Sequence, residues 1–134
     1  MPLFAPRGTV AEIEQGSTFT PKFDADGLIP AVVTEAGSGT VLMFAWMNAE
    51  ALQLTLDTRI AHFWTRSRQR LWKKGEESGN LLDVVDVRTD CDQDVVLVSV
   101  TIRGVGVACH TGATSCFYRR VELGGARALV RDAT

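Results

Sequence analysis

The sequence lacks any stretch of apolar residues long enough to cross a membrane. One of its longest uncharged stretches, residues 36–48, is interrupted by glycine, serine and threonine, and a spanning helix needs ~20 apolar residues. Met1 to Phe4 show neither the basic nor the apolar segment of a secretory signal. The net charge is only −2, which argues against binding nucleic acid by bulk attraction. We expect a cytoplasmic protein with no membrane or nucleic-acid partner.

The composition is that of one folded domain. The chain has 134 residues, of which 46% are hydrophobic and 22% charged, and this balance is typical of globular rather than disordered proteins. Neither an internal repeat nor a low-complexity tract divides it. We therefore predict a single domain over residues 1–134, with an irregular lead-in over residues 1–22 and a weakly patterned tail over residues 122–134.

The hydrophobic pattern predicts more strand than helix. Asn48 is placed as the N-cap of a short helix over residues 49–56, and residues 66–80 have the polar, glycine-bearing composition of a loop. Runs rich in β-branched and aromatic residues predict the strands, at residues 29–34, 40–46, 61–65, 81–88, 95–103 and 116–121. The predicted fold class is α+β, with a mainly antiparallel sheet and one or two short helices.

Cysteines are few, and no two of them form a C-x-x-C pair. An odd number, three, argues against a disulfide framework. Free cysteine is often simply buried, but Cys91 stands among three aspartates and Cys109 directly precedes a histidine. Zinc takes thiolate ligands, and three protein ligands leave the fourth position open for water. Cys91, Cys109 and Cys116 are therefore predicted zinc ligands, with plain burial as the alternative.

Residues 90–94 read Asp-Cys-Asp-Gln-Asp. In extended backbone, alternate side chains point to opposite faces, so Asp90, Asp92 and Asp94 would face one side and Cys91 the other. Carboxylates suit a hard cation such as Mg²⁺, and a thiolate suits a soft one. An EF-hand is excluded because Val95 stands where the calcium loop needs glycine. A magnesium site and a solvated acidic turn both remain open.

Basic residues concentrate between residues 66 and 74 of an otherwise acidic chain. Arginine binds phosphate through two parallel hydrogen bonds, and small residues let backbone N–H groups approach phosphate oxygens. A solvated loop, or a single-stranded nucleic-acid site with stacked aromatics, would use the same residue types. The compact cluster and the negative net charge favour a small phosphorylated ligand. The basic residues are Arg66, Arg68, Arg70, Lys73 and Lys74, with Ser67, Ser78 and Gly79 nearby.

His62 and His110 are the only histidines. His62 lies beside Phe63 in a predicted strand, and a structural role explains it as well as a catalytic one. His110 follows a predicted zinc ligand, which favours a general base or proton shuttle. Three thiolates would acidify a zinc-bound water less than neutral ligands do, so a nearby base is useful. The H-x-E and P-C-x-x-C motifs of cytidine deaminases are absent.

Taken together, these motifs resemble the phosphoribosyl-AMP cyclohydrolases of histidine biosynthesis. The resemblance covers roughly residues 23–121, with one conservative departure at Thr65, where the family usually has serine. Some members carry a second, downstream domain, and only residues 122–134 follow here, so we expect the monofunctional form. The matching segments are residues 27–32, 41–43, 47–52, 66–68, 71–79, 90–94, 108–112 and 115–119.

The resemblance implies a cyclic amidine hydrolase that opens the N1–C6 bond of the adenine ring of phosphoribosyl-AMP to give formimino-AICAR ribonucleotide. It also implies an intertwined homodimer with one zinc ion per subunit, held by Cys91 of one chain and Cys109 and Cys116 of the other. Magnesium is assigned to Asp90, Asp92 and Asp94. The zinc ion would activate water and His110 would move the proton. Trp72 would stack on a ring, and Glu76 would orient a ligand or bind ribose unless it is merely solvated. The predicted binding residues that would hold the two phosphates are Arg66, Ser67, Arg68, Lys73, Lys74, Ser78 and Gly79.

A zinc-stabilised nucleic-acid-binding module is the alternative from another functional class. Its surface would be the same basic, aromatic loop. A chelator distinguishes the two, because a structural zinc site unfolds when its metal is removed. A catalytic site would lose turnover while the fold persists.

Overall fold

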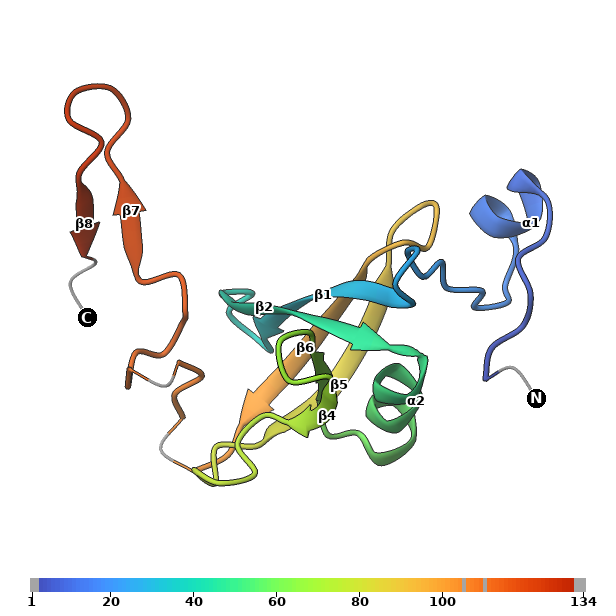
Figure 1. Ribbon diagram of the computed structural model, residues 1–134, viewed down its shortest axis with the longest axis horizontal. Coiled ribbons are helices and arrows are strands. Elements are labelled where there is room, and N and C mark those ends of the chain that lie inside the picture. Colours follow the sequence, from blue (N-terminus) through green and yellow to red (C-terminus); the bar gives the residue numbers. More distant parts are fainter. Residues whose placement is uncertain (1–2, 105, 110, 132–134) are drawn as a thin grey trace.

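The computed structural model describes residues 3–104, 106–109 and 111–131 (Figure 1). Its centre is a 6-stranded sheet in the order β4-β3-β2-β1-β6-β5. The strands are β1 (Leu28–Glu35), β2 (Val41–Asn48), β3 (His62–Thr65), β4 (Arg70–Lys73), β5 (Leu82–Thr89) and β6 (Val96–Ile102). The remaining described elements are the helices α1 (Val10–Gln15) and α2 (Ala49–Thr58) and the paired strands β7 (Arg119–Val121) and β8 (Leu129–Arg131). The predicted α+β class is confirmed.

One strand pair places the acidic residues 90–94. All named pairs in the sheet are antiparallel except β1 with β6, which are parallel, with Ala31 opposite Val96. Parallel strands need a long crossover connection, and here the chain from β2 to β5 provides it. Because parallel strands begin at the same end, the turn that precedes β6 lies beside the segment that leads into β1. Residues 90–94 therefore lie close to the N-terminal segment.

The core follows the two-residue period of the strands. β1 buries Ile29, Ala31 and Val33, and β6 buries three valines at the same spacing. Alternate side chains face the same side of a strand, so these positions form one continuous apolar surface. Phe63 on β3 and Leu52 on α2 are fully buried against it.

Helix α2 begins at the predicted residue and ends two residues beyond the predicted end. The Asn48 side chain accepts a hydrogen bond from the Ala51 N–H at 2.8 Å, which satisfies one of the free N–H groups of the first turn. Thr55, fully buried, donates its hydroxyl to the Ala51 carbonyl and accepts the His62 N–H at 2.9 Å. The His62 ring Nδ1 lies 2.7 Å from the Ile60 carbonyl oxygen. The helix and the start of β3 are thus tied together by local hydrogen bonds.

The structure differs from the sequence-based expectation at three elements. β4 lies inside the predicted 66–80 loop, because pairing with β3 supplies hydrogen bonds that the local composition does not show. α1 lies in the predicted irregular lead-in, where Thr9 and Glu12 form a reciprocal capping box. β8 lies in the weakly patterned tail and pairs with β7, which is shorter than the predicted strand over residues 116–121. Within the described residues, neither helix has the length and apolarity to cross a bilayer.

Candidate functional site

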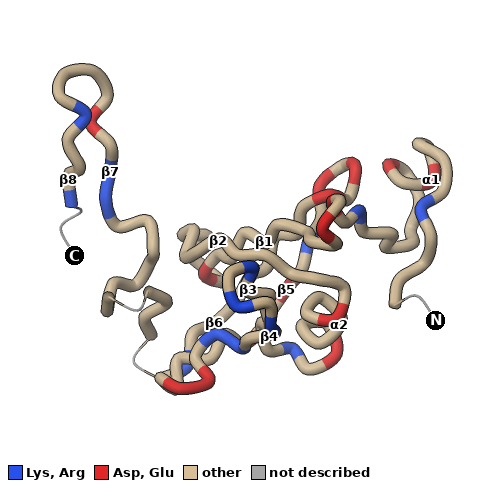
Figure 2. The backbone as a smooth tube through the Cα atoms, viewed as in Figure 1, with Lys and Arg blue, Asp and Glu red and all other residues tan. Residues whose placement is uncertain are grey.

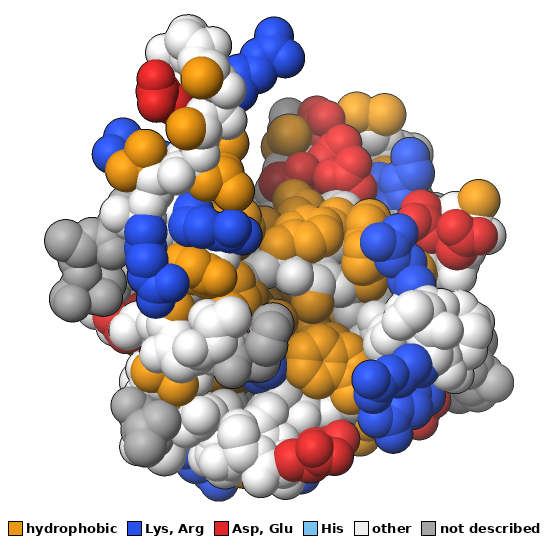
Figure 3. All heavy atoms as spheres, turned by 60° about the vertical axis from the view of Figure 1, so that its left-hand side comes forward, with side chains coloured by type: hydrophobic (Ala, Val, Ile, Leu, Met, Phe, Trp, Pro, Cys, Tyr) orange, Lys and Arg blue, Asp and Glu red, His pale blue; other side chains and the backbone are white. Residues whose placement is uncertain are grey.

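A cleft of about 860 Å³ opens around the β3–β4 hairpin. Its basic side chains outnumber its two acidic ones, and three tryptophans contribute aromatic surface. Figure 3 shows one face of the molecule, on which exposed hydrophobic side chains lie between groups of lysine and arginine. The lining residues are Ala45, Trp46, Trp64, Thr65, Arg66, Ser67, Arg68, Arg70, Trp72, Lys73, Lys74, Gly75, Glu76, Glu77 and Ser78.

Two basic side chains of the cleft lie over aromatic rings. The Arg66 guanidinium is 4.9 Å from the centroid of the Trp46 ring, and the Lys74 ammonium is 5.8 Å from that of Trp72. Such cation–π contacts hold long side chains in place at a partly exposed site. The cleft therefore combines positive charge, which attracts phosphate, with flat apolar surface, which accepts a ring.

Nearly all the predicted binding residues meet in this cleft. Gly79 is the exception: its N–H donates to the Gly75 carbonyl at 2.8 Å and it closes the loop outside the lining. Trp46 and Trp64, which were not among the predicted binding residues, line the cleft and lie opposite each other on β2 and β3. Trp46 is distant from the basic cluster in sequence, so only the strand pairing reveals it.

The second feature of the site is a pair of thiols in the segment after β6. The Cys109 N–H donates to the Ala113 carbonyl and the Gly112 N–H donates to the Cys109 carbonyl, at 3.1 and 3.0 Å. These bonds fold the chain back so that the Cys109 and Cys116 side chains hydrogen-bond each other. The Cys116 N–H donates to the Leu42 carbonyl at 2.7 Å. The thiol pair is therefore held against β2.

The two thiols differ in their readiness to ionise. Burial opposes ionisation of Cys109, but hydrogen bonds from Thr111 and Cys116 and the charge of Lys74 outweigh it, and the pKa of the Cys109 thiol is lowered. Burial and the neighbouring Cys109 raise the pKa of the Cys116 thiol. Lys74 acts on both thiols and also lines the cleft. The thiol pair thus lies next to the basic cleft.

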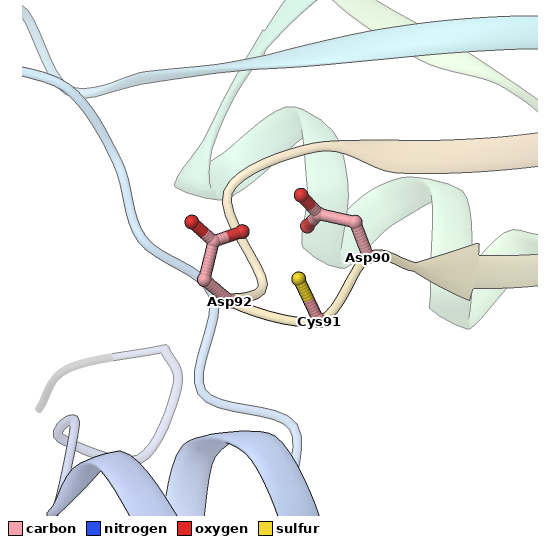
Figure 4. Close-up of side chains that lie close together, drawn as sticks. All are labelled: Asp90, Cys91 and Asp92. Atoms are coloured by element: carbon pink, nitrogen blue, oxygen red, sulfur yellow. The ribbon is translucent and has the colours of Figure 1, made fainter.

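The third feature is the acidic turn, residues 90–94, between β5 and β6. One ligand atom from each of Asp90, Cys91 and Asp92 lies within 4.8 Å of the others (Figure 4). The prediction that Cys91 faces away from the aspartates is wrong. These residues form a tight turn rather than extended backbone, with Gln93 at φ 56°, so the side chains of Asp90, Cys91 and Asp92 converge.

Negative charge is crowded in the acidic turn. Hydrogen bonding to Asp90, together with desolvation and the charge of Asp92, raises the pKa of the Asp94 carboxyl to about 6. Desolvation opposes ionisation of Asp90, but hydrogen bonds from Asp92, Asp94 and the Val95 N–H outweigh it and lower the pKa of its carboxyl. Neighbouring carboxylates that repel each other are stabilised by a cation. The turn is therefore a possible metal site.

Gln93, which sequence reasoning missed, fastens the acidic turn to the N-terminal segment. Its side chain is 5% exposed, accepts the Thr20 N–H at 2.7 Å and donates to the Ile13 carbonyl at 2.9 Å. Arg7 adds a bond from its guanidinium to the Asp92 carbonyl at 2.8 Å. A polar residue between aspartates gives no local sign that it is buried. Only the fold shows that Gln93 and the lead-in residues position the turn.

The three cysteines do not meet within the described part of one chain. Cys91 precedes β6 and Cys109 follows it, and a strand of seven residues spans roughly 20 Å. The acidic turn and the segment after β6 accordingly lie at opposite ends of the strand (Figure 1). Cys91 and Cys116 are exposed, while Cys109 is buried. His110 lies outside the described residues.

Comparison with known proteins points to one family. A family model described as phosphoribosyl-AMP cyclohydrolase matches residues 43–118. A phosphoribosyl-AMP cyclohydrolase from a Chelativorans species is 57% identical over 127 residues, which cover 95% of this chain and 91% of that protein. Proteins of the same name are 58% identical over 115 residues in Brucella canis, covering 86% and 83% of the two chains, and 62% identical over 109 residues in Brucella anthropi, covering 81% and 77%.

Proposed function

Because the chain belongs to the phosphoribosyl-AMP cyclohydrolase family, we propose that it hydrolyses phosphoribosyl-AMP in histidine biosynthesis. The reaction opens the N1–C6 bond of the adenine ring: the oxygen of water bonds to C6, and N1 leaves with a proton. The product is formimino-AICAR ribonucleotide. The observation that carries the proposal is the cleft of about 860 Å³, whose basic and tryptophan lining suits a ligand with two phosphates and a purine.

The cleft residues bind and orient this substrate. Arg66, Arg68 and Lys73 supply positive charge for the phosphates, and Ser67 and Ser78 supply hydroxyl donors. The Trp72 ring, already packed against Phe63 with centroids 5.1 Å apart, offers a rigid surface for the base. Glu76 lies in the same lining and can accept hydrogen bonds from a ribose hydroxyl. Binding at both ends of the substrate fixes the ring relative to the thiols.

The donor set fits a zinc ion shared between two chains. Cys109 and Cys116 are in hydrogen-bond contact, and the lowered pKa of Cys109 favours the thiolate that a soft metal takes. The exposed Cys91 of the partner subunit completes the set of three. When bound, zinc would polarise a water molecule, and because three thiolates acidify that water less than neutral ligands do, a nearby base would complete its activation. This arrangement requires a homodimer with one zinc ion per subunit. Magnesium would be held separately, by the carboxylates of Asp90, Asp92 and Asp94.

His110 directly follows Cys109 in the sequence and is proposed to move the proton. Its imidazole takes a proton from the attacking water and delivers it to N1 as the N1–C6 bond breaks, so one residue serves as base and then as acid. His110→Ala should abolish turnover while the protein still binds zinc. Turnover close to that of the wild type would remove His110 from the mechanism.

The decisive experiment follows the absorbance change when the purified protein is mixed with phosphoribosyl-AMP. We expect turnover in zinc-loaded protein, loss of turnover after chelation, and recovery when zinc is restored. Circular dichroism of the chelated protein is the parallel measurement: retained structure with lost turnover identifies a catalytic metal. Absence of turnover in the zinc-loaded protein would refute the proposed activity. Unfolding on chelation would favour the zinc-stabilised binding module.

A further inference from the structure

A smaller hollow of about 380 Å³ adjoins the cleft at the β3–β4 hairpin. It shares Trp64 and Arg66 with the lining of the cleft, so the two spaces are neighbours along one surface. The other lining residues come from the turn before β1, the start of β1, the end of β2 and the turn after β3. They are Asp26, Leu28, Asn48 and Gln69. None of these four is among the binding residues proposed above.

The polar groups of the hollow select a ligand with two different ends. An ionised Asp26 carboxylate can only accept hydrogen bonds, whereas the Arg66 guanidinium can only donate them. A phosphate is attracted by Arg66 and repelled by Asp26. A sugar hydroxyl can donate to Asp26, and the Asn48 and Gln69 amides can serve further hydroxyls. A sugar that carries both hydroxyls and a phosphate therefore suits this lining better than a phosphate ion alone.

Arg66 is held at the boundary between the two spaces. Its guanidinium lies 4.9 Å from the centroid of the Trp46 ring, and its backbone carbonyl accepts the Gln69 side-chain N–H at 2.7 Å. Figure 2 shows lysine and arginine concentrated around β3 and β4. Because contacts with Trp46 and Gln69 restrict Arg66 before any ligand arrives, less conformational entropy is lost when it binds a phosphate.

The turn before β1 presents Asp26 without depending on its side chain. Asp24 builds this turn: its carboxylate accepts the Asp26 and Leu28 N–H groups, both at 2.9 Å. The side chain of the exposed Asp26 takes no part in these bonds. Asn48 likewise uses its Oδ1 to cap α2, and the other branch of the same amide is a donor. The fold thus positions both residues through atoms other than those that would meet a ligand.

We propose that this hollow is the subsite for one of the two ribosyl phosphate groups of the substrate. The inference rests on the proposed function, because phosphoribosyl-AMP carries one such group on N9 of the adenine ring and another on N1. The cleft holds the base and one group, with Glu76 at its ribose. The hollow holds the other: Asp26 accepts hydrogen bonds from the ribose hydroxyls, and Arg66 donates to the phosphate.

The kinetic test compares Asp26→Ala with the matched control Asp57→Ala, which removes an exposed aspartate of α2 that lines neither space. In zinc-loaded protein we expect Asp26→Ala to raise KM about tenfold, with kcat within about twofold of the wild type, because a hydrogen bond to a charged group is lost. Asp26→Asn keeps an acceptor oxygen and should recover part of this loss. The control should change neither constant. A wild-type KM in Asp26→Ala would overturn the subsite.

A binding measurement tests the hollow without turnover. Ribose 5-phosphate is added to ¹⁵N-labelled protein, and the indole N–H signal of Trp64 is followed by NMR. We expect this signal to shift in the wild type and in Asp57→Ala, and the affinity to fall about tenfold in Asp26→Ala. Equal affinities in the three proteins would overturn the subsite, as would a hollow that binds a free amino acid and not ribose 5-phosphate.

AMP identifies which ribosyl phosphate enters the hollow, because AMP carries only the group on N9. Weaker AMP binding in Asp26→Ala assigns the N9 group to the hollow. Unchanged AMP binding together with a raised KM for phosphoribosyl-AMP assigns the N1 group. A wild type without turnover would refute the proposed activity, whereas normal turnover with an unaltered KM in Asp26→Ala would refute the subsite alone.

Discussion

Complementation between inactive variants tests whether the zinc ligands come from two chains. Cys91→Ser removes one ligand and Cys109→Ser removes another, and each variant alone should be inactive. In a mixed dimer, the intact Cys91 of one subunit meets the intact Cys109 and Cys116 of the other, so one of its two sites is whole. Because half the dimers are mixed after statistical exchange, we expect about a quarter of wild-type turnover per subunit.

The structure sets this expectation. Cys109 and Cys116 lie together, whereas β6 separates them from Cys91 by roughly 20 Å, the length of a strand of seven residues. The assay is the same absorbance change, after the two variants are unfolded together and refolded with zinc. The matched control mixes Cys109→Ser with Cys116→Ser, which damage the same half of the site and should stay inactive. Mixed dimers that native mass spectrometry detects but that show no turnover would refute the shared site.

Three further variants test the cleft, the turn and the core. Arg66→Ala should raise KM at least about tenfold with little change in kcat, because a charge-assisted phosphate contact is lost. Arg88→Ala, which removes an exposed ion pair with Asp86 on β5, should change neither constant. An unaltered KM in Arg66→Ala would place Arg66 outside the binding site. Gln93→Leu should destabilise the protein by about 2 kcal/mol in urea unfolding, since buried backbone groups lose their partners, and should weaken metal binding at the acidic turn. Leu52→Ala should cost about 2–5 kcal/mol because its fully buried side chain leaves a cavity; a loss below about 1 kcal/mol would contradict the packing of α2.

Local signals were sufficient for most of the elements. The alternation of apolar residues predicted β1, β2, β3, β5 and β6 to within two residues at nearly every end, and Asn48 marked the start of α2. These features depend on neighbours in sequence, such as the N-cap bond from Ala51 to Asn48. β4 and β8 depend on a partner strand instead, since with four and three residues they are too short for a pattern of their own. The capping box of α1 is likewise a local signal, carried by Thr9 and Glu12.

The chemistry of the candidate site was also readable from residue types. Thiols, carboxylates and a basic cluster have defined preferences for soft metals, hard metals and phosphates, and these preferences do not depend on the fold. The predicted facing of Cys91 failed because it assumed extended backbone, whereas the hairpin from β5 to β6 makes residues 90–94 a turn. The conformation of five residues depended on a pairing that their own sequence does not show.

The amino-acid sequence by itself determined which groups are available: three thiols, an acidic run, a basic aromatic segment and the alternating strands that carry them. The tertiary structure alone decided which of those groups meet. It paired Cys109 with Cys116, turned the Cys91 thiol toward Asp90 and Asp92, added Trp46 to the cleft and buried Gln93 under the lead-in. The physical reason is that side-chain chemistry and short-range periodicity are local properties. Distances between segments depend instead on strand order and direction, here above all on the parallel pairing of β1 with β6.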